Sequence, residues 1–406
     1  MKILFADALH SVGVDQLTSA GHDVVVLPQL KDEALGEALA EHRPTVLVVR
    51  STKVTASHLN AWSGLALVVR AGAGVNTIDL TAAGARGVYV ANCPGKNAVA
   101  VAELTMGLLL AIDRKIPDNV AWSRRGEWNK KGFSKGRGLK GRTLGILGFG
   151  AIGRSLAKRA RAFGMDVVAW SRSLTAASAA AADVGFAETP IALASQVDVI
   201  SVHCAQTAET RHLVGQELLA ALPEGAIVLN TSRDGLVDEQ ALLAALDTKG
   251  LWAGLDVFDG EPATKTGPFD SPLRSHPRVY LTHHIGAATE QAQSSVAREA
   301  VKVILGFARD GQVLNCVNLV QESSAQHGLA IRHQDRVGAL ASILEVLRAH
   351  QLNIQEMENA VFTGGEAAVA RIQVHGEPNQ AMIDELHALE HVLHVSSFAM
   401  TSGGTP

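Results

Sequence analysis

A motif with three glycines lies in the first half of the sequence and reads Gly148-Phe149-Gly150-Ala151-Ile152-Gly153. It follows an apolar run, Thr143–Leu147, and leads into a helical stretch, Arg154–Phe163, which closes at Gly164 before another apolar run. In a strand–turn–helix of this kind the glycine backbone can approach a pyrophosphate, whose charge lies at the helix N-terminus. The motif therefore predicts a Rossmann-type domain with a dinucleotide-binding loop at these six residues. A tight strand–helix turn without a ligand is the alternative.

Short β-branched runs alternate with helical stretches in two series along the chain. The first series comprises Ile3–Phe5, Val24–Leu27, Val46–Val49, Leu67–Val69 and Val88–Val90. The second comprises Thr143–Leu147, Val167–Trp170, Val197–Val202, Ala226–Asn230, Ala253–Val257 and Val279–Leu281. Strands that alternate with helices predict parallel sheets, so the expected fold class is α/β with two such units. The segment between them, Ser123–Lys140, is expected to be a solvated loop or, alternatively, an arm that contacts another subunit.

The composition excludes several classes of protein. Hydrophobic residues make up 47% of the 406 residues, which is enough for several packed cores and too much for a disordered chain. At about 100–200 residues per domain, the length predicts two to four domains. The formal net charge of -4 argues against a nucleic-acid-binding or membrane-surface protein, because either would need a basic surplus.

The cysteines and the longest apolar stretch bear on the location of the protein. Cys93, Cys204 and Cys316 are far apart and lack metal-ligand spacing. We therefore expect no metal site, no disulfide framework and a reducing, cytoplasmic location. Asp7 interrupts the first apolar run too early for a signal peptide. The stretch Ala98–Ile112 is shorter than the ~20 apolar residues of a membrane span, so it is expected to be a buried helix.

Three polar side chains follow the last three runs of the second series. Arg233, Glu261 and His284 each come after one of these runs. Ligands of open α/β sheets bind beyond the carboxyl ends of the strands, so we expect these side chains to meet there. Arginine binds a carboxylate through two parallel hydrogen bonds, histidine exchanges protons near neutral pH, and a neighbouring carboxylate favours the charged imidazole. The set predicts hydride transfer to or from a 2-hydroxy acid, with Arg233 for the substrate, His284 as acid/base and Glu261 as its partner.

These segments resemble the D-isomer-specific 2-hydroxyacid dehydrogenases, and among them the phosphoglycerate dehydrogenases, over essentially the whole chain. Further motifs that carry the resemblance are Val49-Arg50-Ser51-Thr52-Lys53-Val54-Thr55, Arg70-Ala71-Gly72-Ala73-Gly74-Val75-Asn76 and Ala102-Glu103-Leu104-Thr105. The resemblance implies that Arg233, Glu261 and His284 are catalytic and that Asp256 faces the nicotinamide carboxamide. The residues that it places around the substrate carboxylate and phosphate are Arg50, Arg70, Gly74, Val75 and Asn97.

The resemblance also implies a discontinuous architecture. A flavodoxin-like α/β substrate domain would comprise residues 1–97 and 285–320, and the Rossmann-type NAD(P)-binding domain, residues 98–284, would be inserted between them. Closure of these two domains over the substrate would exclude water.

The implied reaction is the NAD(P)-dependent oxidation of D-3-phosphoglycerate to 3-phosphohydroxypyruvate, a step of serine biosynthesis. One alternative is a reductase of glyoxylate, hydroxypyruvate or another D-2-hydroxyacid pair. Arg50, Arg70 and the Lys130–Lys131 pair should matter for phosphoglycerate and be dispensable for a smaller acid. Another alternative is a redox-sensing corepressor without turnover, against which the intact Arg–Glu–His set argues.

The sequence departs from the family pattern at three positions. Asp234 stands where the family usually has Gly after the catalytic Arg, and its carboxylate would weaken the field that Arg233 offers an anion. His283 stands where Pro usually precedes the catalytic His, and Ala205 where Pro is common. The position in the motif favours His284 over its neighbour as the acid/base. None of the three changes removes a catalytic group.

The second strand of the predicted cofactor domain ends without the usual carboxylate. An Asp or Glu about 20 residues after the glycine motif commonly binds the ribose 2′-hydroxyl. Here the chain reads Ala169-Trp170-Ser171-Arg172. Ser171 and Arg172 can instead hold the 2′-phosphate of NADP, which slightly favours NADP. If Arg172 is only a solvated loop residue, NAD binds without the acidic contact.

The last part of the chain, residues 327–406, predicts a separate small unit behind a polar linker, residues 321–326. Between Leu329 and Ala399 its order reads strand, helix, strand, strand, helix and strand, which is the ferredoxin-like βαββαβ pattern.

Two segments of this unit, Ile331–Gly338 and Leu352–Ile354, resemble an ACT domain. The resemblance implies an amino-acid effector, such as L-serine, at His333, Asp335 and Asn353, and a homodimer or homotetramer. An Asn is expected where Asp335 stands and a Pro where Val337 stands. The alternative is a dimerisation module without a ligand.

Overall fold

The computed structural model describes residues 1–262, 266–320 and 323–400. The chain forms two compact units, Met1–Asn318 and Leu319–Pro406. The first unit contains two parallel sheets, and the second contains one antiparallel sheet. The α/β class predicted from the alternating runs is therefore confirmed. Residues 321 and 322 of the predicted linker and the last six residues of the predicted third domain lie outside the described residues.

The first sheet has five strands in the flavodoxin-like order β2-β1-β3-β4-β5. Its strands are β1 (Lys2–Phe5), β2 (Asp23–Val26), β3 (Val46–Val49), β4 (Leu67–Arg70) and β5 (Tyr89–Asn92). The central strands read as continuous apolar runs because helices cover both faces. One face packs against α1 (Ser11–Ser19) and α13 (Glu290–Asp310), and the other against α2 (Asp32–His42), α3 (Ala56–Ala61) and α4 (Leu80–Ala85).

The second sheet has seven strands in the order β12-β11-β10-β9-β6-β7-β8, which is the Rossmann order with one added edge strand. Its strands are β6 (Thr143–Leu147), β7 (Asp166–Trp170), β8 (Gly185–Phe186), β9 (Val199–Val202), β10 (Ile227–Asn230), β11 (Trp252–Leu255) and β12 (Val279–Leu281). Six of these strands match the predicted runs. The sequence did not predict β8, because its two residues form no apolar run.

Two groups of helices cover this sheet. One face packs against α5 (Ala98–Arg114), α8 (Ala151–Ala162) and α9 (Ala176–Ala181). The other packs against α10 (Pro190–Ala194), α11 (Gln216–Ala221) and α12 (Glu239–Thr248). The apolar stretch predicted to be a buried helix forms most of α5. Among the described residues, no helix is both long and apolar enough to cross a membrane.

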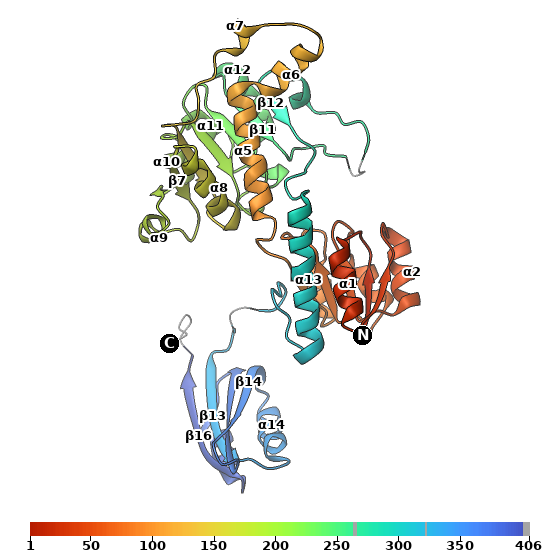
Figure 1. Ribbon diagram of the computed structural model, residues 1–406. Helices are drawn as coiled ribbons and strands as arrows, with labels where there is room; N and C mark the ends of the chain where they lie inside the picture. The colour runs from red at the N-terminus through yellow and green to blue at the C-terminus, as the bar shows by residue number, and fades with distance from the viewer. Residues whose placement is uncertain (263–265, 321–322, 401–406) are drawn as a thin grey trace. The chain divides into compact units, whose positions relative to one another are not determined.

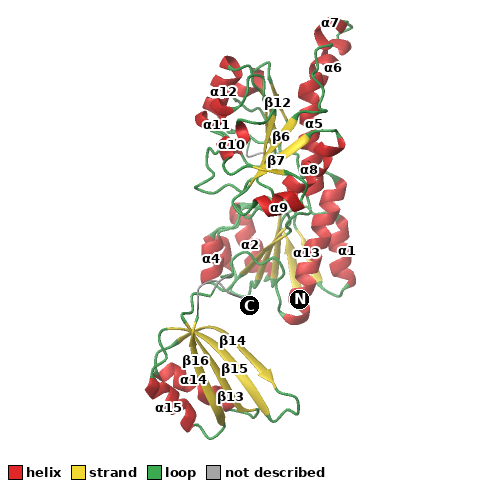
Figure 2. Cartoon of the chain, turned by 90° about the vertical axis from the view of Figure 1, so that its left-hand side faces the viewer, coloured by secondary structure: helices red, strands yellow, loops and turns green. Residues whose placement is uncertain are grey.

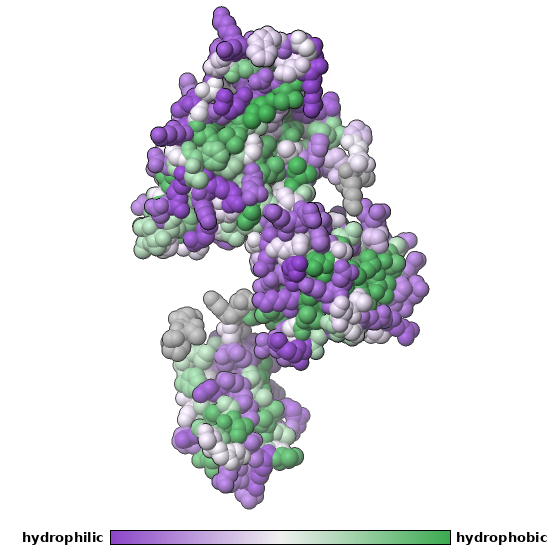
Figure 3. Space-filling model, viewed as in Figure 1, coloured by the Kyte–Doolittle hydropathy of each residue, from purple (hydrophilic) through white to green (hydrophobic). Residues whose placement is uncertain are grey.

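The segment between the two sheets continues from α5 into two short helices. These are α6 (Ile116–Arg124) and α7 (Lys130–Phe133), which Figure 1 shows at the end of α5 that is remote from the first sheet. No residue of α6 is buried. Hydrophilic and hydrophobic residues are interspersed on the face of the chain drawn in Figure 3. The exposed apolar residues Ile116 and Val120 lie on α6, a helix without a packed face.

The second unit is a four-stranded antiparallel sheet in the order β14-β15-β13-β16 (Figure 2). Its elements in chain order are β13 (His327–Gln334), α14 (Ala339–Ala349), β14 (Asn353–Val361), β15 (Ala367–His375), α15 (Gln380–Ala388) and β16 (Val392–Ala399). Apolar residues of α14 and α15 pack on one face of the sheet. The predicted βαββαβ order is confirmed.

Candidate active site

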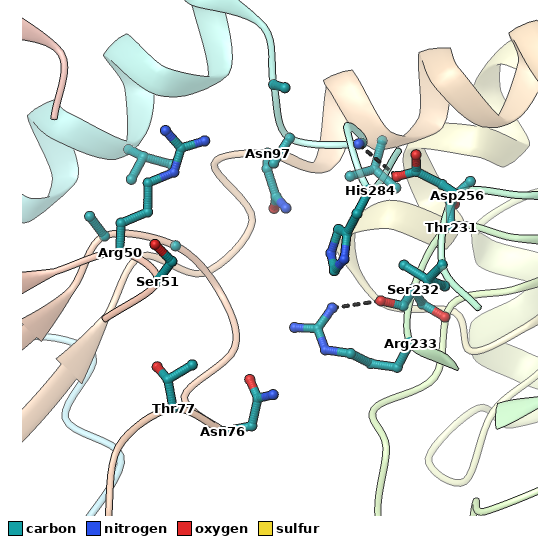
Figure 4. Close-up of a pocket in the computed structure, with 18 of the residues that line it drawn as sticks. Arg50, Ser51, Asn76, Thr77, Asn97, Thr231, Ser232, Arg233, Asp256 and His284 are labelled. Atoms are coloured by element: carbon teal, nitrogen blue, oxygen red, sulfur yellow. Dashed lines mark hydrogen bonds between the residues drawn. The ribbon is translucent and has the colours of Figure 1, made fainter. Parts of the chain in front are cut away.

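The carboxyl ends of three adjacent strands carry the polar side chains that the sequence predicts to meet. β10 pairs with β11 and β11 with β12, so the segments that follow them leave the same edge of the sheet. Arg233, Glu261 and His284 lie on these segments, and Asp256 directly follows β11. Figure 4 shows His284 and Arg233 across a gap from Arg50, which follows β3 of the first sheet.

A cavity of about 580 Å³ lies among these residues. The predicted site residues that line it are Arg50, Arg70, Asn97, Arg233, Asp256, Glu261 and His284. Gly74 and Val75 are not among its lining residues, although Gly74 lies against the guanidinium of Arg233. Lys130 and Lys131, expected to matter for a phosphorylated substrate, lie on α7 and do not line the cavity.

Several polar residues that the sequence did not assign to the site also line the cavity. These are His10, Ser51, Asn76, Thr77, Thr231, Ser232, Asp234 and Gln293. Most follow strands or precede helices, where a turn decides which way a side chain points. Ser51 and Asn76 belong to two motifs that carry the family resemblance. Their position beside Arg50 and Arg70 in these motifs was the sequence signal that could have assigned them to the site.

The imidazole of His284 is held by Glu261. Nδ1 of His284 lies 2.8 Å from Oε2 of Glu261, and the N–H of Phe258 donates to Oε1 of Glu261 at 3.1 Å. The hydrogen bond from Glu261 raises the pKa of His284, although burial opposes this effect. Because Nδ1 is engaged, Nε2 is the ring nitrogen left for a reacting group in the cavity. His283 instead packs its ring against Phe269, 6.4 Å between centroids.

The turn that carries His284 is organised by Asp256, which is 1% exposed. The backbone φ of His284 is 51°, a conformation that few residues other than glycine adopt. Its N–H donates to the Asp256 carbonyl at 2.9 Å, and the N–H groups of Ile285 and Gly286 donate to the carboxylate at 2.9 and 2.7 Å. Oγ1 of Thr282 donates to the same carboxylate at 2.6 Å. The observed contacts of the Asp256 carboxylate are thus with this turn, and the contact with the nicotinamide carboxamide that the family resemblance implies stays a prediction.

Three guanidinium groups line the cavity, from Arg50, Arg70 and Arg233. Burial lowers the pKa of Arg70 to about 10, and the positive charges of Arg233 and Arg50 add to this effect. Among the described residues, Nε of Arg70 is buried without a hydrogen-bond partner. Nη1 of Arg233 donates to the carbonyl of Ser232 at 2.6 Å. Like charges that converge on one cavity are stabilised by an anion bound between them, so the arrangement suits a substrate with more than one negative charge.

The glycine loop follows β6, in the middle of the second sheet. Gly148 has a φ of 97°, and a Cβ atom there would lie 2.6 Å from the carbonyl carbon of His203. A Cβ on Gly153 would lie 2.4 Å from the carbonyl oxygen of Gly148. Both positions therefore require glycine. Within the described part of the chain, no side chain caps the N-terminus of α8, so its first N–H groups remain for a ligand, and the loop fits the pyrophosphate of a dinucleotide.

The residues after β7 lie beside this loop. The N–H of Gly148 donates to the carbonyl of Trp170 at 2.8 Å, which places Ser171 and Arg172 next to the glycine loop. Ser171 is half-buried and Arg172 is exposed. The side chain of Arg172 is therefore accessible to a ligand at the end of β7.

The predicted effector residues of the second unit do not meet within one chain. His333 lies near the end of β13, where it pairs with Ala368, whereas Asn353 begins β14 and pairs with His375 at the opposite end of the sheet. His333 is 1% exposed, and its Nε2 lies 3.1 Å from Oδ1 of Asn359. Any site that uses both His333 and Asn353 thus needs two copies of this unit.

Comparison with known proteins places this chain in a family. Residues 106–286 match the family model described as the D-isomer specific 2-hydroxyacid dehydrogenase, NAD binding domain. The D-3-phosphoglycerate dehydrogenase of Escherichia coli is 33% identical over 362 residues, which cover 87% of each chain. The chain belongs to the D-isomer specific 2-hydroxyacid dehydrogenases.

Other members of the 2-hydroxyacid dehydrogenase family are similar over part of their length. The D-3-phosphoglycerate dehydrogenase of Methanocaldococcus jannaschii is 40% identical over 327 residues, which are 79% of this chain and 61% of that protein. This chain thus spans about three fifths of the length of that relative. The hydroxypyruvate reductase of Thermotoga maritima is 42% identical over 261 residues, which are 64% of this chain and 83% of that protein.

Solved structures of the same family agree with the fold. The NAD+-bound 3-phosphoglycerate dehydrogenase of Entamoeba histolytica has a TM-score of 0.65 at 29% identity, covering 79% of this chain and 99% of that chain. A second structure is the NADPH-dependent glyoxylate/hydroxypyruvate reductase of Sinorhizobium meliloti in complex with NADP and malonate. It has a TM-score of 0.67 at 29% identity, covering 78% of this chain and 96% of that chain. Family membership therefore leaves the choice of hydroxy acid and of cofactor to the residues of the site.

Proposed function

We propose that this enzyme oxidises D-3-phosphoglycerate to 3-phosphohydroxypyruvate. The observation that carries the proposal is the cavity that three arginines line together with the His284–Glu261 pair. A substrate with a carboxylate and a phosphate has an anionic group at each end, and a cluster of arginines matches both. The similarity to D-3-phosphoglycerate dehydrogenases of Escherichia coli and Methanocaldococcus jannaschii supports the same substrate.

The proposed chemistry assigns one task to each side chain. Arg233 holds the substrate carboxylate, and Nε2 of His284 takes the proton from the C2 hydroxyl. Glu261 orients the imidazole and stabilises the imidazolium that forms. The bound nicotinamide cofactor supplies the acceptor for the hydride from C2. In the reverse direction, His284 returns the proton to the C2 oxygen of the keto acid.

The remaining residues bind the two ends of the substrate and the cofactor. Arg50 and Arg70 are proposed to hold the phosphate, with Asn97, Gly74 and Val75 beside them. In this proposal residues 1–97 and 285–320 form the substrate domain, and residues 98–284 form the cofactor domain. The glycine loop binds the pyrophosphate, and Ser171 and Arg172 contact the ribose, with NADP accepted as well as NAD. Both cofactors occur among the similar structures.

A substrate panel tests the assignment. D-3-phosphoglycerate, other D-2-hydroxy acids and the corresponding keto acids would be assayed separately with NAD and NADP. We expect the highest kcat/KM with the phosphorylated pair. A higher kcat/KM for hydroxypyruvate or glyoxylate would instead establish the alternative, which the similarity to the hydroxypyruvate reductase of Thermotoga maritima favours.

We propose that the α6–α7 segment contacts a second copy of the chain. α6 has no buried residue, and Ile116 and Val120 on it are 47% and 42% exposed, while Trp128 just beyond it is 87% exposed. Apolar side chains in such exposed positions favour a subunit interface. A Val120→Asp variant should shift the sedimentation coefficient toward the monomer, whereas an unchanged coefficient would show that this segment makes no contact.

We also propose that the second unit is an ACT-like module that acts between two copies. The separation of His333 and Asn353 along one sheet supports a shared site rather than one within a single chain. The candidate effector is an amino acid such as L-serine. We place the protein in the cytoplasm, because Cys93, Cys204 and Cys316 are free thiols.

A further inference from the structure

The carboxylate of Asp7 organises the loop that carries Arg50. Asp7 follows β1, which pairs with β3, and the loop after β3 begins at Arg50. Oδ2 of Asp7 accepts hydrogen bonds from the backbone N–H groups of Arg50, Ser51 and Thr52 at 2.7, 2.9 and 2.9 Å. Oδ1 accepts a fourth, from Oγ of Ser51, at 3.0 Å. One side chain therefore fixes three consecutive peptide groups.

Successive peptide N–H groups that converge on one point form a concave site for an anion. In this loop the chain supplies the anion itself. Burial raises the pKa of Asp7, but the hydrogen bonds from Arg50, Thr52 and Ser51 together outweigh burial and keep this pKa below its ordinary value. Asp7 is therefore ionised near neutral pH. The three N–H groups of the loop are already engaged by Asp7, so a substrate anion must be met by the side chains of the loop.

Asp7 is not one of the residues that line the cavity, whereas Arg50 and Ser51 are. Its effect on a ligand must therefore pass through the loop. Thr52 has a second anchor, because its Oγ1 donates to the carbonyl of Leu30 at 3.1 Å. The Arg50 end of the loop is held by the neighbouring strand and by Asp7. Loss of the carboxylate would thus release the part of the loop that presents the Arg50 guanidinium.

We propose that Asp7 is a positioning residue for anion recognition, which holds the Arg50–Thr52 loop so that Arg50 meets the distal anionic group of the substrate. The inference rests on the proposed function for the identity of that group, a phosphate. It predicts that Asp7 contributes to the preference for a phosphorylated keto acid over an unphosphorylated one.

The test compares 3-phosphohydroxypyruvate with hydroxypyruvate as substrates of the full chain. An Asp7→Asn side chain keeps its shape and one acceptor oxygen for the three N–H groups, but it loses the negative charge and places an N–H₂ group where the carboxylate accepts from Oγ of Ser51. We expect the KM for 3-phosphohydroxypyruvate to rise about tenfold while kcat changes by less than about twofold, since three hydrogen bonds to a charged group become bonds to a neutral amide and the bond from Ser51 loses its acceptor. The KM for hydroxypyruvate should change little. Asp23→Asn removes an exposed carboxylate from the neighbouring strand β2 and is the matched control.

A double-mutant cycle with Arg50→Ala separates positioning from general destabilisation. If Asp7 acts through Arg50, Asp7→Asn should have almost no further effect on KM in the Arg50→Ala background. Equal losses with both substrates, or additive effects of the two substitutions, would overturn the proposal. If the wild type does not reduce 3-phosphohydroxypyruvate, the proposed substrate is wrong. The cycle is then measured on the keto acid that the enzyme does reduce, and additivity there would refute the role of Asp7.

Discussion

Glu261 lies with its Oε2 2.8 Å from Nδ1 of His284, and it is itself held by the N–H of Phe258 at 3.1 Å. The carboxylate thus sets both the orientation of the imidazole and its affinity for a proton. The raised pKa of His284 has a definite consequence for the direction of catalysis. Oxidation needs the neutral imidazole as base, whereas reduction needs the imidazolium as acid.

The pH profile of oxidation should therefore depend on Glu261. The carboxylate raises the pKa of His284. The value of kcat/KM for oxidation should therefore increase with pH around a midpoint above the ordinary pKa of histidine. Glu261→Gln removes the charge, so this limb should move to lower pH while the maximal rate drops as the ring loses its orientation. The pH dependence of kcat/KM in both variants is the measurement. A limb that stays in place would mean that another group titrates.

Removal of the imidazole should almost abolish turnover. A general acid/base contributes about 10²–10⁴-fold, so we expect His284→Ala to lose activity within that range and to keep cofactor binding. His283→Ala is the matched control, because that ring packs against Phe269 outside the cavity. Single-turnover rates of the two variants decide between the neighbours, and a larger loss in His283→Ala would reverse the assignment.

Arg233→Lys should keep the fold and lose most of the activity. Lysine retains the charge but cannot make two parallel hydrogen bonds to a carboxylate. We expect kcat/KM to fall by about 10- to 100-fold, which corresponds to the loss of a hydrogen bond between charged groups. Steady-state kinetics with the phosphorylated and unphosphorylated keto acids measure the change. Equal, near-normal values for both would show that Arg233 does not hold the carboxylate.

Most of the fold could be predicted because buried parallel strands appear in the sequence as apolar β-branched runs. The exception, β8, has only two residues at a sheet edge, and its pairing with β7 is a tertiary effect. The segment Ser123–Lys140, expected to be a solvated loop or a subunit-contacting arm, contains the helix α7 and the last two residues of α6. These helices were not predicted, because neither has a buried residue whose spacing would indicate a packed helix.

The site was predictable where side chains directly follow strands of one sheet. Arg233, Glu261 and His284 were predicted for this reason, and all three line the cavity. Ser51 and Asn76 were not assigned, because their direction depends on loops of the other sheet. Lys130 and Lys131 were expected to contribute charge, yet the chain places them on α7, away from the residues that line the cavity. The role of Asp7 was likewise hidden, since it depends on β1 and β3 being neighbours.

Cofactor preference should respond to the residue after β7. The wild type has Ser171 and an exposed Arg172 beside the glycine loop, where a carboxylate would bind the ribose hydroxyl of NAD. Ser171→Asp should shift the ratio of kcat/KM toward NAD, because the new carboxylate accepts from that hydroxyl and repels a 2′-phosphate. Arg172→Ala should weaken NADP use alone. A wild type that already rejects NADP would remove the basis of this prediction.

Inhibition by L-serine should be weak in the wild type and stronger in Asp335→Asn. Asparagine offers both a donor and an acceptor to an amino acid, whereas an ionised aspartate only accepts and repels the carboxylate of the effector. His333 already has Asn359 as a partner, so a ligand must displace or share that contact.

Titration of activity with L-serine should show a cooperative response, since the proposed site needs residues from two copies. If control acts on binding, L-serine and the substrate should each change the affinity of the enzyme for the other by the same factor. The control is Asp384→Asn, which changes an exposed carboxylate on α15 of the same unit. Potent inhibition of the wild type would show that Asp335 does not oppose the effector. No response in either the wild type or the Asp335→Asn variant would leave the unit as an assembly module, because the charge that repels the effector carboxylate at this position would have been removed without effect.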